Sequence, residues 1–403
     1  MGGLRTLMVT RRYWPQMGDD AACRLATLAA GLRRRGARPH IVAARYAASW
    51  PKDLSVRETP VHRPAPAPRS EWSMPRYTRA LTNWLREQAP AFDLLYADAM
   101  REEGAMVVEV ARRAGVPSVL RYAGVGDCSD DAWWATSRAA KRCMGVCLKA
   151  DAVIATRASA EQTLLSAGLS RSRIHRIDDG FVPGPPNDPA ARAAARKALA
   201  NVNSDLFVPV DGKVLLTTNR MVAEGGLGDL VKVLPELLER HPQLRVWLTN
   251  DGELRDDFFE YLRGCGVRSL VSMPGSFGAV DELLLASDLY VLPRDTDGLE
   301  YYFPRIVGAG IPAAVVDTVE TRRLLAESFS QAVSFPPDHP AAIRDALETL
   351  LSDYPQSQKT ARHIRQTALQ HSFGESVEQH LRLFCRLTGK TLTGNSMTAE
   401  PLL

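Results

Sequence analysis

The sequence predicts an α/β fold of two doubly wound, parallel-sheet domains that face a common cleft. Short apolar runs alternate with segments of helical periodicity along the chain, which is typical of βαβ units and parallel sheets. A segment rich in Gly and Pro, 179–189, interrupts this alternation near the middle, because proline there stops any helix or strand from continuing. The 403 residues are too many for one ordinary core and suit two domains.

In the first half, short apolar runs predict strands, and longer amphipathic stretches between them predict helices. The expected strands cover 4–9, 39–42, 93–97, 118–121, 152–155 and 174–177, and the expected helices cover 21–35, 75–88 and 101–114. Prolines alternate within 60–75, so we expect this segment to be a loop.

The second half repeats the pattern after a short Ala-rich helix at 190–200. Its expected strands cover 214–218, 244–248, 269–273, 288–292 and 313–316, and its expected helices cover 227–240, 253–264, 280–287, 302–309, 340–352, 358–370 and 376–387. We therefore expect an N-terminal domain at 1–183 and a C-terminal domain at 184–373.

Composition limits the class of partner. The chain is 45% hydrophobic and 24% charged with a net charge of only +4, which is globular and gives no reason to expect nucleic-acid binding. The first seventy residues are nevertheless rich in arginine. These arginines either lie at solvated helix ends or attract an anionic membrane surface or a phosphorylated acceptor. They include Arg11, Arg12, Arg33, Arg34 and Arg35.

Cysteine spacing and hydropathy predict a cytoplasmic protein. The six cysteines are scattered without a Cys-x-x-Cys pair, so we expect them to be reduced. No set of His and Cys residues suggests a metal site. Thr10-Arg11-Arg12 ends the first apolar run too early for a signal peptide. No apolar run approaches the roughly 20 residues that span a bilayer.

The most informative segment is 293–300 together with 308–312. An apolar run precedes Pro293 and a second one follows Pro312, so the pattern is strand, Gly-containing turn, helix and strand. In a parallel sheet such a turn lies at the carboxyl edge, where ligands bind. Backbone N–H groups at the start of the following helix suit an anion such as a diphosphate.

Several motifs occur in an order that resembles one family. They are Tyr13-Trp14-Pro15-Gln16-Met17-Gly18, the pair 151–156 and 174–181, Asn219-Arg220 with Glu224-Gly225-Gly226, Asn250-Asp251-Gly252-Glu253, the run 282–293, Gly310-Ile311-Pro312 and the closing segment 373–387. Together they resemble the GT-B glycosyltransferases of the large retaining family 4. The likeness covers nearly all of the chain up to about residue 387.

The resemblance implies transfer of a sugar from a nucleotide-diphosphate donor to a glycan, lipid-linked or small-molecule acceptor. It implies retention of configuration and no metal or cofactor, with the donor on the second domain and the acceptor on the first. It also implies a helix at 374–388 that crosses back to the first domain, followed by a disordered tail at 389–403. The basic first domain would allow peripheral contact with the inner membrane face.

For the donor, the resemblance implies that Arg220 grips the diphosphate, the alternative being a surface or structural ion pair. The family's usual lysine position holds Gly225, and Lys232 or Arg294 are candidates to replace that cation. The other expected donor-side positions are Gly18, Asn250, Gly252, Gly298, Leu299 and Glu300.

The family's motif of two Glu residues is degenerate, because its two positions hold Asp297 and Arg305. We expect Asp297 to hold hydroxyls of the donor sugar as a catalytic-site carboxylate, or to begin a helix. Arg305 either donates to the ribose or phosphate or has become a surface residue.

In the first domain, the loop after 118–121 lacks the family's frequent histidine. Asp127 is the nearest catalytic replacement, with a capping role as the alternative. On the acceptor side we expect Gly124 to allow close backbone approach, Trp133 to stack on a sugar or pack in the core, and Asp19 to face the acceptor or solvent.

These departures leave a second function open: a non-catalytic relative that keeps the fold as a binding or scaffold protein after losing its donor clamp. A sugar-nucleotide epimerase or a phosphorylase on the same architecture is a third possibility, because one fold supports many chemistries.

Overall fold

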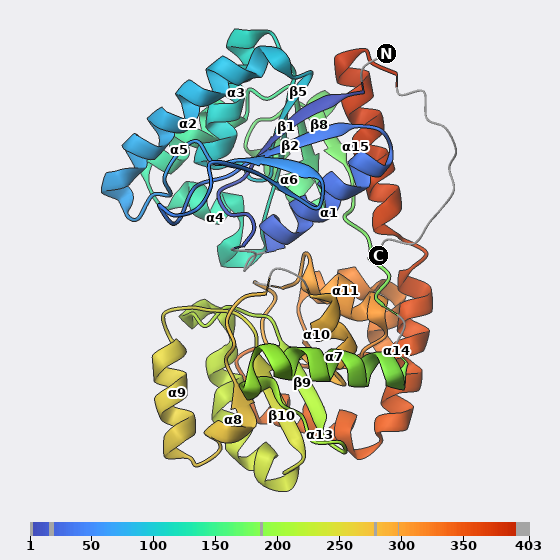
Figure 1. Cartoon of the computed structure of the whole chain (residues 1–403). Helices are drawn as coiled ribbons and strands as arrows, with labels where there is room; N and C mark the ends of the chain where they lie inside the picture. The colour runs from blue at the N-terminus through green and yellow to red at the C-terminus, as the bar shows by residue number, and fades with distance from the viewer. Residues whose placement is uncertain (1–2, 16–19, 186–187, 278–279, 297, 392–403) are drawn as a thin grey trace. The chain divides into compact units, whose positions relative to one another are not determined.

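The computed structural model describes residues 3–15, 20–185, 188–277, 280–296 and 298–391 (Figure 1). Within this part of the chain there are two compact units. The first comprises 3–14, 21–179 and 373–391, and the second comprises 180–372 with Pro15 and Asp20. The chain therefore leaves the first unit after Asp179 and returns to it at Phe373.

The sheet of the first unit has eight strands among the described residues, in the order β3-β4-β2-β1-β5-β6-β7-β8. Every neighbouring pair is parallel except β3 and β4. The strands are β1 (Arg5–Val9), β2 (Arg38–Val42), β3 (Asp53–Val56), β4 (Thr59–His62), β5 (Leu94–Ala97), β6 (Ser118–Arg121), β7 (Ala152–Ala155) and β8 (Ile174–Arg176).

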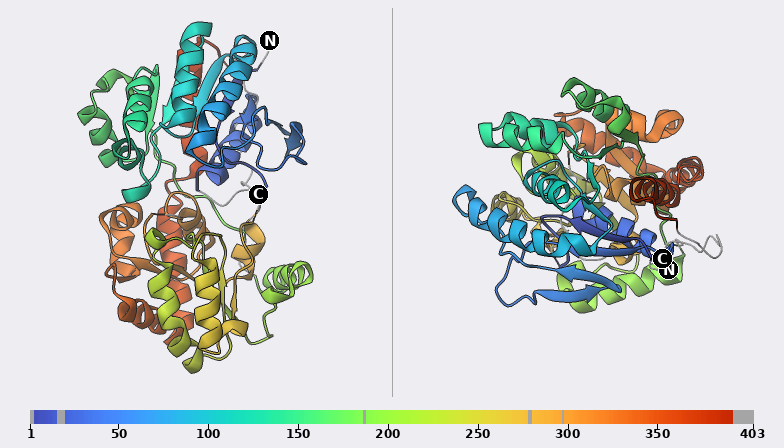
Figure 2. Two further views of the ribbon diagram at one scale, coloured as in Figure 1. Left: turned by 90° about the vertical axis from the view of Figure 1, so that its left-hand side faces the viewer. Right: turned by 90° about the horizontal axis from the view of Figure 1, so that it is seen from above.

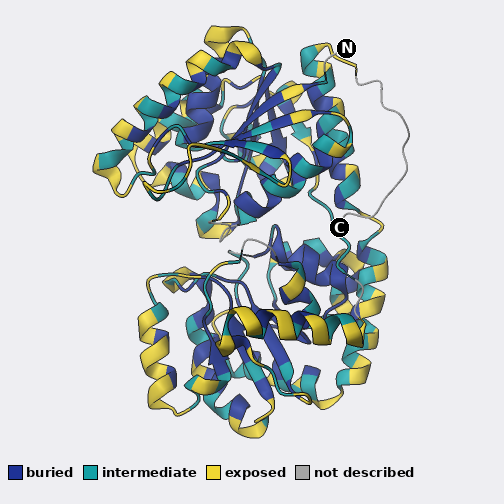
Figure 3. Cartoon of the chain, viewed as in Figure 1, coloured by how far each residue is buried: buried dark blue, intermediate teal, exposed yellow. Residues whose placement is uncertain are grey.

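Helices cover both faces of this sheet, which explains why β5, β6 and β7 are buried along their whole length (Figure 3). On one face, Leu7 and Val9 pack into a core shared with α2, α3, α5 and α6. Elsewhere in the unit α15 packs on α1, where a Cβ on Gly31 would lie 2.7 Å from Val377. The helices are α1 (Asp20–Arg34), α2 (Met74–Gln88), α3 (Glu102–Ala114), α4 (Asp130–Ala135), α5 (Arg138–Cys147), α6 (Ala158–Ser166) and α15 (Phe373–Thr388).

The expectation that 60–75 forms a loop is wrong at both ends. Residues 60–62 belong to β4, which pairs with β3 as an antiparallel hairpin at the edge of the sheet, and α2 begins at Met74. The two residues between these strands, Arg57 and Glu58, have φ of 47° and 63°. Two-residue hairpin turns of this kind normally use Gly, Asn or Asp, so the usual signal is missing from the sequence.

The second unit contains a six-stranded, fully parallel sheet within the described residues, in the order β11-β10-β9-β12-β13-β14. Its strands are β9 (Lys213–Thr217), β10 (Leu244–Leu248), β11 (Val271–Ser272), β12 (Leu289–Leu292), β13 (Ala313–Val316) and β14 (Val333–Phe335). Its helices are α7 (Pro189–Val202), α8 (Leu227–Arg240), α9 (Arg255–Gly264), α10 (Asp281–Ala286), α11 (Tyr302–Ala309), α12 (Val319–Leu325), α13 (Pro340–Ser352) and α14 (Tyr354–Ala368).

Helices lie on both faces of this sheet (Figures 1 and 2). Leu215, Val291 and Ala314 pack into a core with α8 and α13. On the opposite face Tyr290 stacks on Phe303 of α11, with ring centroids 6.2 Å apart. The predicted fold class, an α/β protein of two parallel-sheet domains, is confirmed.

Candidate functional site

Three loops of the second unit meet at the carboxyl edge of its sheet. They follow β9, β10 and β12, and β9 lies between the other two strands. This is the edge at which open parallel sheets bind ligands. It carries most of the donor-side residues expected from the sequence.

The loop after β9 is tied to the loop after β12 by buried polar side chains. Nδ2 of Asn219 donates to the carbonyl oxygen of Arg294 at 3.0 Å, and the Thr218 hydroxyl lies 2.8 Å from that of Tyr290. Burial raises the pKa of Tyr290, so its phenol stays neutral. Asn219 is fully buried, and its Oδ1 has no hydrogen-bond partner among the described residues. Arg220, the next residue, is half-buried.

Asn250 and Gly252 connect the loop after β10 to the loop after β9. Nδ2 of Asn250 donates to the carbonyl oxygen of Thr218 at 3.0 Å. A Cβ on Gly252 would lie 2.2 Å from the carbonyl oxygen of Met221, so this position admits only glycine without a shift of the backbone. Both residues hold the edge together, and a direct role of either in donor binding stays a prediction.

Gly225 fills the position where the family resemblance expects lysine. A Cβ there would lie 2.2 Å from the carbonyl oxygen of Arg220, so the backbone occupies the space that a lysine stem needs. The two candidate replacements are engaged elsewhere. Lys232 lies on α8 at 3.1 Å from Asp229, and Arg294 forms an ion pair with Asp338.

The loop after β12 provides backbone donors. Gly298 has φ of 87°, and a Cβ there would lie 3.0 Å from Oγ1 of Thr218. Asp20, which groups with the second unit, accepts from the N–H groups of Gly298 and Glu300 at 3.0 and 3.1 Å. These N–H groups therefore suit an anionic oxygen. Leu299 between them is buried.

Arg305 lies in the first turn of α11 and is 9% exposed. Its guanidinium forms an ion pair with Asp281 of α10 and lies 5.4 Å from the ring centroid of Tyr301. The alternative of a surface position is wrong, because this side chain is buried. Its contact with a donor stays a prediction. Asp297, Gly18 and Asp19 lie outside the described residues.

In the first unit, Gly124, Asp127 and Trp133 lie in or near the loop after β6. Gly124 has φ of 79°, and a Cβ there would lie 2.3 Å from the carbonyl oxygen of Cys128. Asp127 is exposed, and Ser129, not Asp127, caps α4, so the capping alternative is wrong. Trp133 is half-buried, with the guanidinium of Arg101 5.8 Å from its ring centroid.

The carboxylate that organises this loop is Asp130, which the sequence analysis missed. It is fully buried and accepts from the N–H groups of Met100 and Ala123 at 2.8 and 2.9 Å and from Nε of Arg101 at 2.9 Å. Burial raises its pKa, while the Arg101 charge acts in the opposite direction. Asp130 is followed by Asp131, and the sequence contains no signal that shows which of these two carboxylates is buried.

The described residues contain no cluster of three or more His, Cys, Asp or Glu side chains arranged to hold a metal ion. None of their helices is long and apolar enough to cross a membrane.

Comparison with known proteins identifies the class. Residues 21–180 match the model of the glycosyl transferase 4-like domain, and residues 202–370 match that of the glycosyl transferases group 1. One relative is an uncharacterized glycosyltransferase of Methanocaldococcus jannaschii, 24% identical over 156 residues, or 38% of this chain. The chain spans 40% of the length of that relative in this match.

Solved structures agree on the fold. HepE of Anabaena, in complex with UDP and glucose, has a TM-score of 0.70 at 16% identity and covers 95% of this chain and 99% of its own. WaaG, a glycosyltransferase involved in lipopolysaccharide biosynthesis, has a TM-score of 0.70 at 14% identity, with coverage of 96% and 100%. Sucrose-phosphate synthase from Thermosynechococcus elongatus has a TM-score of 0.68 at 15% identity, with coverage of 96% and 100%.

The fold is therefore that of the GT-B enzymes. The two matched domain models together extend over most of the chain, and the chain belongs to the GT-B glycosyltransferases of the family 4 type.

Proposed function

We propose that the chain transfers a sugar from a nucleotide-diphosphate donor to an acceptor, with retention of configuration and without a metal ion or cofactor. The observation that carries this proposal is the carboxyl edge of the second sheet. There Arg220 follows a buried Asn219, and the N–H groups of Gly298 and Glu300 bond a carboxylate oxygen.

Breaking the bond between sugar and nucleotide leaves new negative charge on the diphosphate. Only groups that bind this charge more strongly in the transition state accelerate the step. We assign that task to the Arg220 guanidinium and to the N–H groups of the 298–300 loop, where the diphosphate would replace the Asp20 carboxylate. The leaving diphosphate then accepts the proton of the acceptor hydroxyl, which is consistent with retention and needs no metal ion.

Release of nucleotide diphosphate tests this proposal. The full chain is incubated with UDP-, GDP- and ADP-sugars, with and without mixed glycan acceptors, in the presence of EDTA. We expect one donor to give slow hydrolysis and acceptor-stimulated release, both lost in Arg220→Ala. NMR of the product then shows whether the anomeric configuration is retained. Release that requires an added metal ion would refute the metal-free mechanism, and an inverted product would refute retention.

The acceptor side suggests contact with an anionic membrane at the cytoplasmic face. Several arginines that motivated this expectation are engaged: Arg11 pairs with Glu102 and Glu103, Arg33 with Glu58 and Arg35 with Glu378. A different surface supports it better. Trp72 is 95% exposed in the short 3₁₀ turn Glu71–Ser73 that precedes α2. Arg69, Arg76 and Arg79 around it are exposed and form no ion pair among the described residues.

Tryptophan and arginine together favour the interface of an anionic bilayer. The test is co-sedimentation with vesicles of phosphatidylglycerol or of phosphatidylcholine alone. We expect binding to the anionic vesicles only, and several-fold weaker binding for Trp72→Ser. Trp14→Ser, which changes a tryptophan that is 40% exposed, is the matched control. Equal binding to both vesicle types would contradict the proposal.

A non-catalytic binding protein is the second candidate, and one observation favours it. The backbone at Gly225 leaves no space for the expected lysine, so the donor clamp lacks a cation. Titration calorimetry with nucleotide sugars separates the two functions. Absence of binding would refute the transferase function and favour the scaffold function.

A further inference from the structure

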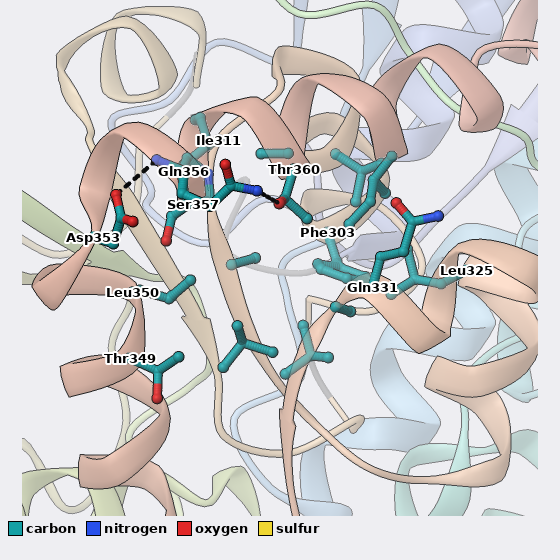
Figure 4. Close-up of a pocket in the computed structure, with 18 of the residues that line it drawn as sticks. Phe303, Ile311, Leu325, Gln331, Thr349, Leu350, Asp353, Gln356, Ser357 and Thr360 are labelled. Carbon is teal, nitrogen blue, oxygen red and sulfur yellow. Dashed lines mark hydrogen bonds between the residues drawn. The ribbon is translucent and has the colours of Figure 1, made fainter.

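The second unit contains a cavity of about 300 Å³ away from the candidate donor site. It lies on the face of the sheet where α11 and α14 pack, next to the beginnings of β13 and β14 (Figure 4). These strand beginnings are at the amino edge, whereas the donor-side loops follow strand ends.

The walls of this cavity select for a particular chemistry. Phe303, Ile311 and Leu325 form an apolar floor, and all three side chains are buried. Gln331, Gln356 and Thr360 supply neutral polar groups around it, and among the described residues no Lys, Arg or His lines it. Asp353, the single carboxylate among these described lining residues, caps α14 by accepting from the N–H group of Gln356 at 3.1 Å. A phosphate or nucleotide would find no cation here.

The volume indicates the size of an occupant. An engineered apolar cavity of roughly 150 Å³ stays dry and binds benzene, and this cavity is about twice that volume. Natural ligand pockets begin at about 300 Å³. We propose that this cavity binds an uncharged, mainly apolar small molecule of two or three aromatic rings, whose one polar group bonds the neutral rim.

The cavity wall is connected to the candidate donor site. The N–H group of Phe303 donates to the carbonyl oxygen of Gly298 at 2.7 Å. The Phe303 ring stacks on Tyr290, whose hydroxyl lies 2.8 Å from that of Thr218. An occupant that packs against Phe303 restricts α11 and the 298–300 loop in the arrangement described. We therefore infer that it lowers the KM for donor, and this second step rests on the proposed function.

Binding is measured with N-phenyl-1-naphthylamine, a neutral fluorescent probe, on the full chain. We expect saturable binding that is at least tenfold weaker in Thr360→Phe, which fills the cavity from α14. Thr367→Phe makes the same change on the same helix at a residue that does not line the cavity, and it should bind as the wild type does. The sulfonated analogue 8-anilinonaphthalene-1-sulfonate should bind at least tenfold more weakly than the neutral probe.

Unaltered probe binding by Thr360→Phe, or no saturable binding by the wild type, overturns the proposed site. If Thr360→Phe does not fold, Ala332→Leu on the opposite wall makes the same test. For the coupling, saturating probe should lower the donor KM at least twofold in the wild type and not in Thr360→Phe. An unchanged KM refutes the coupling. Probe binding without turnover of any nucleotide sugar leaves the site standing and removes the proposed function instead.

Discussion

Placing lysine at position 225 should impair catalysis strongly, although the family resemblance expects lysine there. A Cβ at Gly225 would lie 2.2 Å from the carbonyl oxygen of Arg220. Cβ atoms in protein structures essentially never lie closer than 3.0 Å to another heavy atom of this kind. The carbonyl oxygen of Arg220 would therefore have to move by about 0.8 Å. The displaced backbone carries Arg220, the residue to which we assign the diphosphate.

The size of the effect follows from this displacement. A misplacement of about 1 Å in a catalytic group costs roughly 10²-fold in rate, so Gly225→Lys should lower kcat/KM about 100-fold. Overpacking also costs about 1–3 kcal/mol of unfolding free energy. The assay is release of nucleotide diphosphate, together with denaturant unfolding of the same sample.

Gly228→Lys is the matched control. It adds the same charge three residues further along, where a Cβ meets no atom within 4 Å. Its activity and stability should stay close to those of the wild type. If Gly225→Lys raises kcat/KM, the loop can open to admit the side chain. That result would contradict our interpretation that the backbone at position 225 excludes lysine.

Three further changes test other parts of the molecule. Arg220→Ala should lower kcat/KM by roughly 10²–10³-fold, as loss of an oxyanion donor does, and Arg220→Lys should lose less. Asp288→Ala leaves the partly buried Arg192 and Arg196 without their buried carboxylate partner, so the unfolding free energy in denaturant should fall by about 3–5 kcal/mol. Burial lowers the pKa of His380 to about 4, below about 6.5 in an unfolded chain. Between these two values the unfolded chain binds a proton that the folded chain does not bind. The contribution of neutral His380 to the free energy of unfolding is therefore complete above pH 6.5 and is lost as the pH falls toward 4. In His380→Gln the change in unfolding free energy between pH 6.5 and pH 4 should be smaller than in the wild type by about 3 kcal/mol.

The strands and helices that the sequence predicts best are those whose burial follows one simple pattern. β7 and β13 are continuous apolar runs, as is typical of strands in a covered parallel sheet, and they have the predicted bounds. β6 also has the predicted bounds, although Ser118 and Arg121 flank its two apolar residues. The amphipathic helix α8 and the fully buried helix α11 also have the predicted bounds. The hairpin of β3 and β4 escaped prediction because its turn is built from Arg57 and Glu58 in the left-handed region.

For the candidate site, the sequence predicts which loops meet and not how their side chains pair. Order along the chain places residues 219–226 and 293–300 at one sheet edge, since parallel strands end on the same side. It does not show that Arg305 pairs with Asp281, 24 positions away on another helix. Nor does it show that Tyr290, in the middle of β12, reaches Thr218. Such contacts depend on side-chain direction across neighbouring elements.

Packing requires glycine at several positions of the candidate donor site. At Gly226, Gly252 and Gly298 a Cβ would lie 2.8, 2.2 and 3.0 Å from a neighbouring atom, so glycine is required by the way the loops pack. Positions 225 and 305 departed from the family pattern in their side chains. A site that binds diphosphate mainly through backbone N–H groups keeps its anion affinity through such changes, provided that the loops stay in contact. That is why we weigh a transferase above a scaffold. Gly225 removes a side-chain charge and Arg305 reverses one, while the backbone that would hold the leaving group is still constrained by its own packing.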